Sequence, residues 1–328
     1  MKIIFTATAG KLDFYLEDYA AALARCGNDV KFVPLSKFLH KPFYRFWESG
    51  DGFTCRTLEK TLAGEKCDVL ICNFSSLRFD FPRIRSFFKG KIVLYDMEGP
   101  NFRGFRDLSA LDGVDLIVTV SRVMAEKLNA AGKSAVYIPH AVECSRFKPV
   151  KLSAADEKIF CRKSIFIGRP SPHRIQFLQA FADRGGDLTL YGKQWHREKI
   201  AESAAVPFQT NITGEELLKA VSGAGFAVNI LQDQFLEYRT LMNLQIFFYA
   251  ALGCPLLTEF VEELPECFEE GREMYFFRDQ EEFLDKAQQL SGSPELCAVM
   301  GKAAQERVFK AHTLDHRALV FDRYLREL

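Results

Sequence analysis

The sequence predicts an α/β protein with two parallel-sheet domains in series, and three observations lead to this prediction. The chain has 328 residues, about twice the usual length of a single domain. Short apolar runs alternate with helical patterns in the first part, which is typical of βα units wound into a parallel sheet. The same alternation restarts after residues 140–162, a stretch that has no strong periodicity and contains Pro149.

Charge and cysteine content narrow the class of protein. Lys plus Arg and Asp plus Glu both number 43, so no net charge attracts the chain to nucleic acid. The nine cysteines are scattered without a CxxC pair, as in a cytosolic protein with reduced thiols. The first residues resemble a strand rather than a signal peptide, and no apolar run reaches the roughly 18 residues of a membrane span. We expect a cytoplasmic protein, with peripheral membrane contact left open.

Strands alternate with helices in both halves. In the first half we expect strands at 2–8, 30–34, 68–73, 91–95, 115–120 and 135–139, with helices at 13–26, 82–88 and 121–132. In the second half we expect strands at 164–168, 187–191, 226–231 and 255–258, with helices at 175–183, 194–204, 214–222, 240–252, 280–290, 294–311 and 314–328. The domain boundary is placed between residues 145 and 146. Loops at the carboxyl ends of such strands face ligands, which predicts a site near 229–243 and 258–262.

Residues 35–56 interrupt the regular pattern. Five aromatic residues between Phe38 and Trp47 are mixed with Lys37, Lys41 and Arg45. Such a mixture suits a mobile lid or a platform for a sugar, phosphate or lipid headgroup. The alternative is a long connection whose aromatic side chains pack onto the domain.

Two arginines are the best candidates for binding phosphate. Arg169 and Arg174 lie in the loop that leaves the first strand of the second domain, directly after Gly168, where the backbone can approach a ligand closely. Together they can hold a diphosphate and neutralise the charge of a departing nucleotide. The alternative is a pair of solvated surface arginines.

Further polar residues lie beside the predicted strand ends. Asn229, Arg239 and Asn243 can orient a nucleotide or a sugar hydroxyl through hydrogen bonds, or can fill ordinary turn and cap positions. Acidic residues outnumber basic ones between Glu259 and Asp285, which indicates a solvated face. No DxD spacing occurs, and we assign no metal.

The sequence offers three candidates for a catalytic base. Asp13, Asp96 and Glu98 follow strands of the first domain and are expected to face a cleft between the domains. Burial that raises a carboxyl pKa toward neutrality would suit such a base, whereas a helix cap or loop hydrogen bond is the alternative role. His140 can bind a sugar or phosphate, or be structural. No GxSxG and no GxGxxG occur, which disfavours hydrolases and dinucleotide enzymes.

Motifs in residues 110–328 resemble the GT-B glycosyltransferases, in particular the CgeB-like group of the spore maturation protein type (glycosyl transferases group 1). They are DLIVTVSRVMAEKLNAAG, YIPHAVECSRFKP, FIGRPSPHR, LTLYGKQW, LMNLQIFFYAALGCPLLTEFVEELPECFEEG, FRDQEEFLDKAQQL and AHTLDHR. Their order and spacing carry the resemblance more than any single motif. Residues 1–110 match only as a Rossmann-like half.

The resemblance implies two Rossmann-like domains whose parallel sheets face an interdomain cleft. An acceptor domain spans 1–145, a nucleotide-sugar donor domain spans 146–312, and a helix at 313–328 crosses back to the first domain. Arg169 and Arg174 match positions that hold donor phosphates. The YGxxW residues Tyr191, Gly192 and Trp195 flank the base-binding region, and Asn243 matches an Asn of the segment NxRxFEAxAxG.

The same segment departs from the family pattern at three positions. The familiar Arg is Gln245, the ribose-binding Glu is Phe248, and the acidic residue expected eight positions earlier is Thr240. A phenyl ring cannot accept hydrogen bonds from ribose hydroxyls as a carboxylate does. Either Glu259 or Glu262 holds the ribose, or the donor differs, or catalysis has been lost.

We therefore expect a glycosyltransferase of the hexosyltransferase type that moves a sugar from a nucleotide diphosphate-sugar to an acceptor hydroxyl. No metal and no cofactor other than the donor are expected, and the resemblance favours retention of the anomeric configuration. Under inversion, Asp13, Asp96 or Glu98 would serve as the base. The alternatives are a noncatalytic nucleotide-sugar-binding protein and a GT-B-fold epimerase or hydrolase. The acceptor is open: a glycan, a protein or a small molecule.

Overall fold

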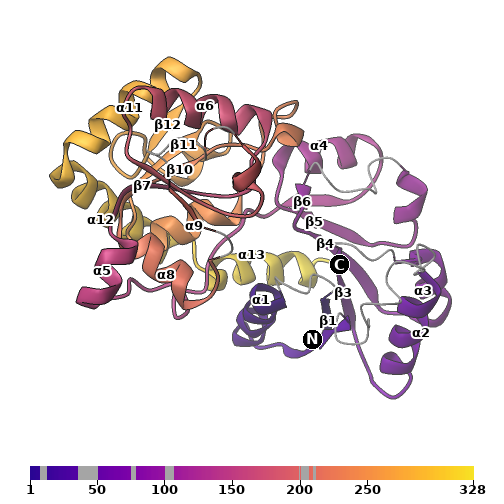
Figure 1. The fold of residues 1–328 in the computed structure, drawn as a ribbon. Coiled ribbons are helices and arrows are strands. Elements are labelled where there is room, and N and C mark those ends of the chain that lie inside the picture. Colours follow the sequence, from indigo (N-terminus) through magenta and orange to yellow (C-terminus); the bar gives the residue numbers. More distant parts are fainter. Residues whose placement is uncertain are drawn as a thin grey trace. The chain divides into compact units, whose positions relative to one another are not determined.

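In the computed structural model, residues 1–7, 13–35, 51–74, 79–99, 107–198, 200, 207–209 and 212–328 are described. The chain divides into two compact units (Figure 1). Unit 1 comprises Met1–Pro139 with Leu314–Leu328, and unit 2 comprises His140–Thr313. The division after Pro139 precedes the boundary expected from the sequence, and the C-terminal segment belongs to unit 1.

Unit 1 is built on a six-stranded sheet in the order β2-β1-β3-β4-β5-β6, with every strand pair parallel. Its strands are β1 (Lys2–Ala7), β2 (Asp29–Pro34), β3 (Val69–Phe74), β4 (Lys91–Asp96), β5 (Leu116–Thr119) and β6 (Ala135–Tyr137). Its helices are α1 (Asp13–Arg25), α2 (Asp51–Leu62), α3 (Phe81–Phe87), α4 (Arg122–Ala130) and α13 (Leu314–Arg326), with the 3-10 helix η5 (Leu108–Leu111). β1 and β4 are buried after their first residue, as expected for parallel strands covered on both faces.

The last helix, α13, packs against α1 within unit 1 (Figure 1). Phe321 of α13 lies with its ring centroid 5.9 Å from that of Tyr19 on α1. Asn28, in the turn after α1, donates a hydrogen bond to Asp322 over 2.7 Å. The C-terminal segment thus completes the core of unit 1.

Unit 2 repeats the arrangement with the strand order β12-β11-β10-β7-β8-β9, again parallel throughout. Its strands are β7 (Arg162–Ile167), β8 (Leu188–Tyr191), β9 (Phe208–Gln209), β10 (Ala224–Asn229), β11 (Leu256–Glu259) and β12 (Tyr275–Phe277). Its helices are α5 (Ala154–Phe160), α6 (Pro172–Asp183), α8 (Glu215–Ser222), α9 (Leu244–Ala251), α10 (Leu264–Cys267), α11 (Gln280–Gly292) and α12 (Pro294–Ala311), with the 3-10 turns η6 (Trp195–Arg197) and η7 (Asp233–Phe235). Two Rossmann-like parallel-sheet units confirm the predicted fold class.

The structure corrects the start of one expected helix, and a second expected helix lies largely outside the described residues. The helix expected from residue 240 begins at Leu244, because Arg239 and Leu241 have positive φ angles and Asn243 caps the helix instead. Of the helix expected over 194–204, the described residues show the 3-10 turn η6 and a helical residue at Ile200, while residues 199 and 201–206 lie outside the described part.

Some elements were not predicted, and some predicted features are not described. The sequence prediction missed α2, α5, β9 and β12, of which α5, β9 and β12 are short. The aromatic and basic segment at 36–50 and residues 100–106 of the loop after β4 lie outside the described part. Among the described helices, none is both long and apolar enough to cross a bilayer.

Candidate functional site

The loop between β7 and α6 presents a free cation and an uncapped helix start. The guanidinium of Arg169 is exposed and has no hydrogen-bond or ion-pair partner among the described residues. Ser171 precedes Pro172, the first residue of α6, and its side chain makes no cap hydrogen bond. Its hydroxyl oxygen is buried without a partner among the described residues. Amide groups at such a helix start attract anions.

Arg174 differs from the free cation that the sequence predicted. Its side chain is only 3% exposed. Nε and Nη2 donate to the carbonyl oxygen of Ile230 over 3.0 and 2.8 Å, and Nη1 donates to the carbonyl oxygen of Arg169 over 3.1 Å. The guanidinium also lies over the Phe166 ring at 5.3 Å, and burial lowers its pKa to about 10. Arg174 therefore ties the loop after β7 to the loop after β10.

Gly168 and Gly192 bring the loops after β7 and β8 into backbone contact. The amide of Gly168 donates to Tyr191, and the carbonyl oxygen of Gly168 accepts a 2.8 Å bond from Trp195 Nε1. A Cβ atom on Gly192 would lie 2.0 Å from that same carbonyl oxygen, and Gly192 has a φ of 143°. The YGxxW residues thus shape the loop beside Arg169.

A chain of amide and hydroxyl groups links β10, β11 and α9. Asn229 Nδ2 donates to Thr258 Oγ1 over 2.9 Å, and Asn229 Oδ1 accepts from Asn243 Nδ2 over 2.8 Å. Asn243 Oδ1 in turn caps α9 by accepting from the Ile246 amide. Both asparagines are therefore engaged in internal hydrogen bonds that fix the carboxyl edge of the sheet.

Glu259, at the end of β11, is only 3% exposed and faces His173 of α6. Its Oε1 and Oε2 lie 2.9 and 3.0 Å from His173 Nε2, and Oε2 also accepts from the Leu231 amide over 2.9 Å. A buried carboxylate needs such partners. Both oxygens have partners within unit 2, so Glu259 is the partner of His173 in this structure, and its role toward a ribose stays a prediction.

The loop from β10 to α9 is strained and is held by a second buried carboxylate. Arg239 and Leu241 have φ angles of 40° and 89°, which cost energy in residues other than glycine. Thr240 between them donates to Glu263, whose other carboxylate oxygen is buried without a partner among the described residues. Arg239 is exposed, and its guanidinium has no hydrogen-bond or ion-pair partner among the described residues.

Positions that depart from the family pattern are filled by internal packing. Gln245 Nε2 donates to the Ile167 carbonyl oxygen over 2.9 Å. Phe248 is 6% exposed and stacks on Phe147, with ring centroids 5.6 Å apart and planes 16° apart. Phe248 is part of the buried apolar core of unit 2.

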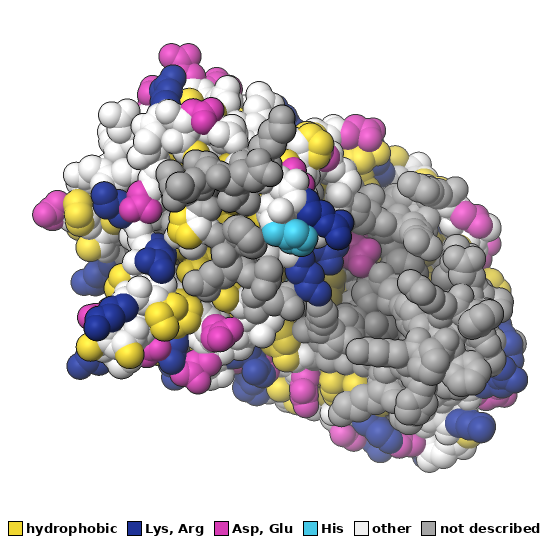
Figure 2. Space-filling model, in the orientation of Figure 1, with side chains coloured by type: hydrophobic (Ala, Val, Ile, Leu, Met, Phe, Trp, Pro, Cys, Tyr) yellow, Lys and Arg dark blue, Asp and Glu magenta, His cyan; other side chains and the backbone are white. Residues whose placement is uncertain are grey.

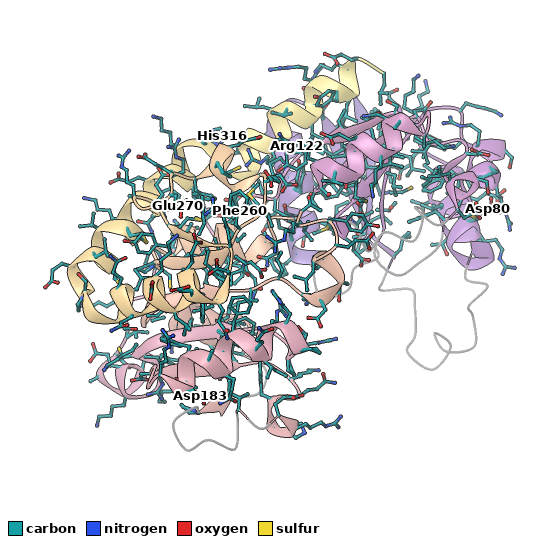
Figure 3. All side chains as sticks on the ribbon, turned by 90° about the horizontal axis from the view of Figure 1, so that it is seen from above. Asp80, Arg122, Asp183, Phe260, Glu270 and His316 are labelled. Atoms are coloured by element: carbon teal, nitrogen blue, oxygen red, sulfur yellow. The ribbon has the colours of Figure 1, made fainter. Side chains whose placement is uncertain are left out.

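The outer surface of unit 2 shows mixed charge. Lys, Arg, Asp and Glu side chains are interspersed over its described residues on the face drawn in Figure 2. Arg278 lies 4.2 Å over the ring of Phe260, which follows β11, and forms an ion pair with Glu270. Figure 3 shows Phe260 and Glu270 near one another, and Asp183 at the end of α6 well apart from them. Among the described residues, no group of His, Cys, Asp or Glu could hold a metal ion.

Of the acidic candidates in unit 1, Asp96 is the best defined. It is fully buried, and burial raises its pKa to about 6. Thr119 Oγ1 donates to its Oδ2 over 2.7 Å, and the amides of Glu98 and Gly99 donate to Oδ1 over 2.9 and 3.2 Å. These bonds hold the start of the loop after β4.

The remaining candidates of unit 1 are less defined. Glu98 is half-buried in the loop after β4. α1 begins at Asp13, whose side chain lies outside the described part. His140 opens unit 2 and is 4% exposed.

Sequence reasoning missed His173 and Glu263. His173 lies in GRPSPHR between the two predicted arginines, so its position near a strand end was a usable signal. Glu263 offered no such signal, because its contact with Thr240 links segments from either side of α9.

Comparisons with known proteins bear on the sequence family and the fold of this chain. Residues 171–321 match a sequence family described as glycosyl transferase-like. No curated protein sequence matches significantly. Three solved structures superimpose over nearly the whole chain. The first is a sucrose-phosphate synthase from Thermosynechococcus elongatus, with a TM-score of 0.70 and 14% identity over 100% of this chain and 98% of that chain. The second is a glycosyltransferase from Rickettsia africae, with a TM-score of 0.72 and 12% identity over 99% of this chain and 98% of that chain. The third is HepE from Anabaena in complex with UDP-glucose, with a TM-score of 0.71 and 13% identity over 100% of both chains. These likenesses show the GT-B fold.

Proposed function

We propose that the protein is a glycosyltransferase that transfers a sugar from a nucleotide diphosphate-sugar to an acceptor hydroxyl. The observation that carries the proposal is the guanidinium of Arg169, which is exposed and has no partner among the described residues, beside the start of α6, where Ser171 forms no side-chain cap. The family match begins at Ser171, within this same loop. That HepE was solved with UDP-glucose and with UDP supports a nucleotide-sugar as the donor.

In the proposed reaction, unit 2 holds the donor at the carboxyl edge of its sheet. Arg169 and the first amides of α6 stabilise the negative charge that develops on the departing diphosphate. The Asn229–Asn243 network and Arg174 keep this edge rigid, so the stabilising groups need little rearrangement during the reaction. The chemistry proposed needs no metal ion.

Several finer features belong to the proposal. We assign the chain to the CgeB-like group and to the hexosyltransferases on its motifs. Retention of configuration is favoured by the same resemblance, with the leaving phosphate accepting the proton of the acceptor hydroxyl. Scattered cysteines favour a cytoplasmic location.

Phe248 favours a second candidate function. Because the usual ribose-binding position is an aromatic stack on Phe147, a binding protein without catalysis also fits this edge. The donor would then bind but not turn over.

Release of nucleoside diphosphate from a panel of nucleotide-sugars tests the proposal. We expect release that increases when monosaccharide acceptors are added, and a loss of roughly 10- to 100-fold in Arg169→Ala, the range for a lost charged hydrogen bond. Binding without release would instead support the binding protein. Conversion of the donor alone into an isomer would indicate an epimerase.

A further inference from the structure

His173 is held in one orientation, which is unusual for a partly exposed histidine. Its side chain is 19% exposed. Glu259 fixes Nε2 through both carboxylate oxygens, and the Phe177 ring lies edge-on with its centroid 5.0 Å away. Among the described residues, Nδ1 has no hydrogen-bond partner. Nε2 is therefore engaged by Glu259, whereas Nδ1 can still bind a ligand.

The surroundings of His173 suit an anion. It is in the first turn of α6, whose N-cap Ser171 leaves the helix amides uncapped. The exposed guanidinium of Arg169 lies in the same short loop, with no partner among the residues that the structure describes. A buried carboxylate such as Glu259 is costly unless it is paired. Pairing with Glu259 also fixes the orientation of His173, whose other ring nitrogen can then meet a ligand.

We propose that His173 binds the diphosphate of the donor through Nδ1, and that Glu259 is the residue that positions it. The imidazolium form donates Nε2–H to Glu259 and Nδ1–H to a phosphate oxygen, whereas the neutral ring has only one N–H. The added proton offsets the charge of the Glu259 carboxylate. This inference rests on the proposed function, because it assigns a new residue to the same site.

Two substitutions separate binding from a purely structural role. His173→Gln keeps an N–H donor in the place of Nε2, so the contact with Glu259 survives while the donor at Nδ1 is lost. His173→Asn does the reverse, because its amide nitrogen takes the place of Nδ1. Glu259→Gln removes the anion but keeps the shape. Glu281→Gln, on an exposed residue of α11, is the matched control.

The test measures dissociation constants for UDP, GDP, ADP and CDP, each beside its own nucleoside, together with the melting temperature. For the best diphosphate we expect His173→Gln to bind roughly 10- to 100-fold more weakly, with unchanged nucleoside affinity and melting temperature. His173→Asn should bind the diphosphate more tightly than His173→Gln does, but its melting temperature should be lower than that of His173→Gln. Glu259→Gln should weaken diphosphate binding in the wild-type chain and not in His173→Gln.

The outcomes that contradict the inference differ from those that contradict the proposed function. If the wild-type chain binds no diphosphate, the proposed function fails and the inference with it. If wild-type chain and His173→Gln bind the diphosphate equally, only the role of His173 is overturned. If His173→Gln loses as much affinity for the nucleoside as for the diphosphate, the role of His173 is also overturned, because such a loss indicates a structural defect.

Discussion

Individual residues in this protein show how burial decides between binding and structural roles. The sequence predicted that Arg169 and Arg174 form a phosphate-binding pair. Only Arg169 is exposed, because the guanidinium of Arg174 donates its hydrogen bonds to two backbone carbonyl oxygens. Sequence spacing puts both in the same loop and cannot show which side chain turns inward. The direction depends on Phe166, in strand β7, and on Ile230, which directly follows strand β10.

Asp96 gives a prediction about pH at this scale. Its folded-state pKa of about 6 lies above the ordinary value of 3.8. The folded state therefore binds the proton more tightly, and this contribution to the free energy of unfolding falls as pH rises from about 4 through 6. In Asp96→Asn that loss is absent. The free energy of unfolding of the variant, relative to that of wild type, should therefore rise by about 2 kcal/mol between pH 4.5 and pH 7.5, since one pKa unit is about 1.4 kcal/mol.

Urea denaturation across this pH range measures the effect. Asp183→Asn, at the exposed end of α6, is the control and should follow the wild-type pH dependence. Parallel curves for wild type and Asp96→Asn would show that burial does not perturb this carboxyl group.

At the scale of elements, the loops at the carboxyl edge of the unit 2 sheet depend on close backbone contact. Gly192 is needed because its φ is positive and the Gly168 carbonyl oxygen occupies the place of a side chain. The sequence predicted the strands on either side, since apolar runs identify buried strands. It could not predict the late start of α9, which depends on the positive φ angles at Arg239 and Leu241.

Gly192→Ala tests this contact. The added methyl group must displace the loop after β7, and we expect a loss of about 3 kcal/mol in the free energy of unfolding. Gly64→Ala is the matched control, because no atom lies within 4 Å of its added Cβ. Chemical denaturation of both variants decides the point. Equal stability for the two would mean that the Gly168–Gly192 approach is not a constraint.

At the scale of the whole molecule, the architecture was predicted better than the contacts of the candidate site. The alternation of strand and helix patterns predicted two parallel-sheet units, and the resemblance to GT-B glycosyltransferases implied the return of the last helix to unit 1. The site was predicted only in outline. Its location at the strand ends follows from topology, but the pairs Glu259–His173 and Glu263–Thr240 join distant segments and emerge only in the folded chain.

The central claim is that the carboxyl edge of the unit 2 sheet binds the diphosphate of a nucleotide-sugar. Calorimetric titration with a panel of nucleotide-sugars tests it most directly, comparing the wild-type chain, Arg169→Ala, and Arg184→Ala at the exposed end of α6. We expect at least one nucleotide-sugar to bind wild type and Arg184→Ala equally, and Arg169→Ala roughly 10-fold or more weakly with an unchanged melting temperature. Absence of binding by every nucleotide-sugar, or equal binding by Arg169→Ala, would contradict the claim.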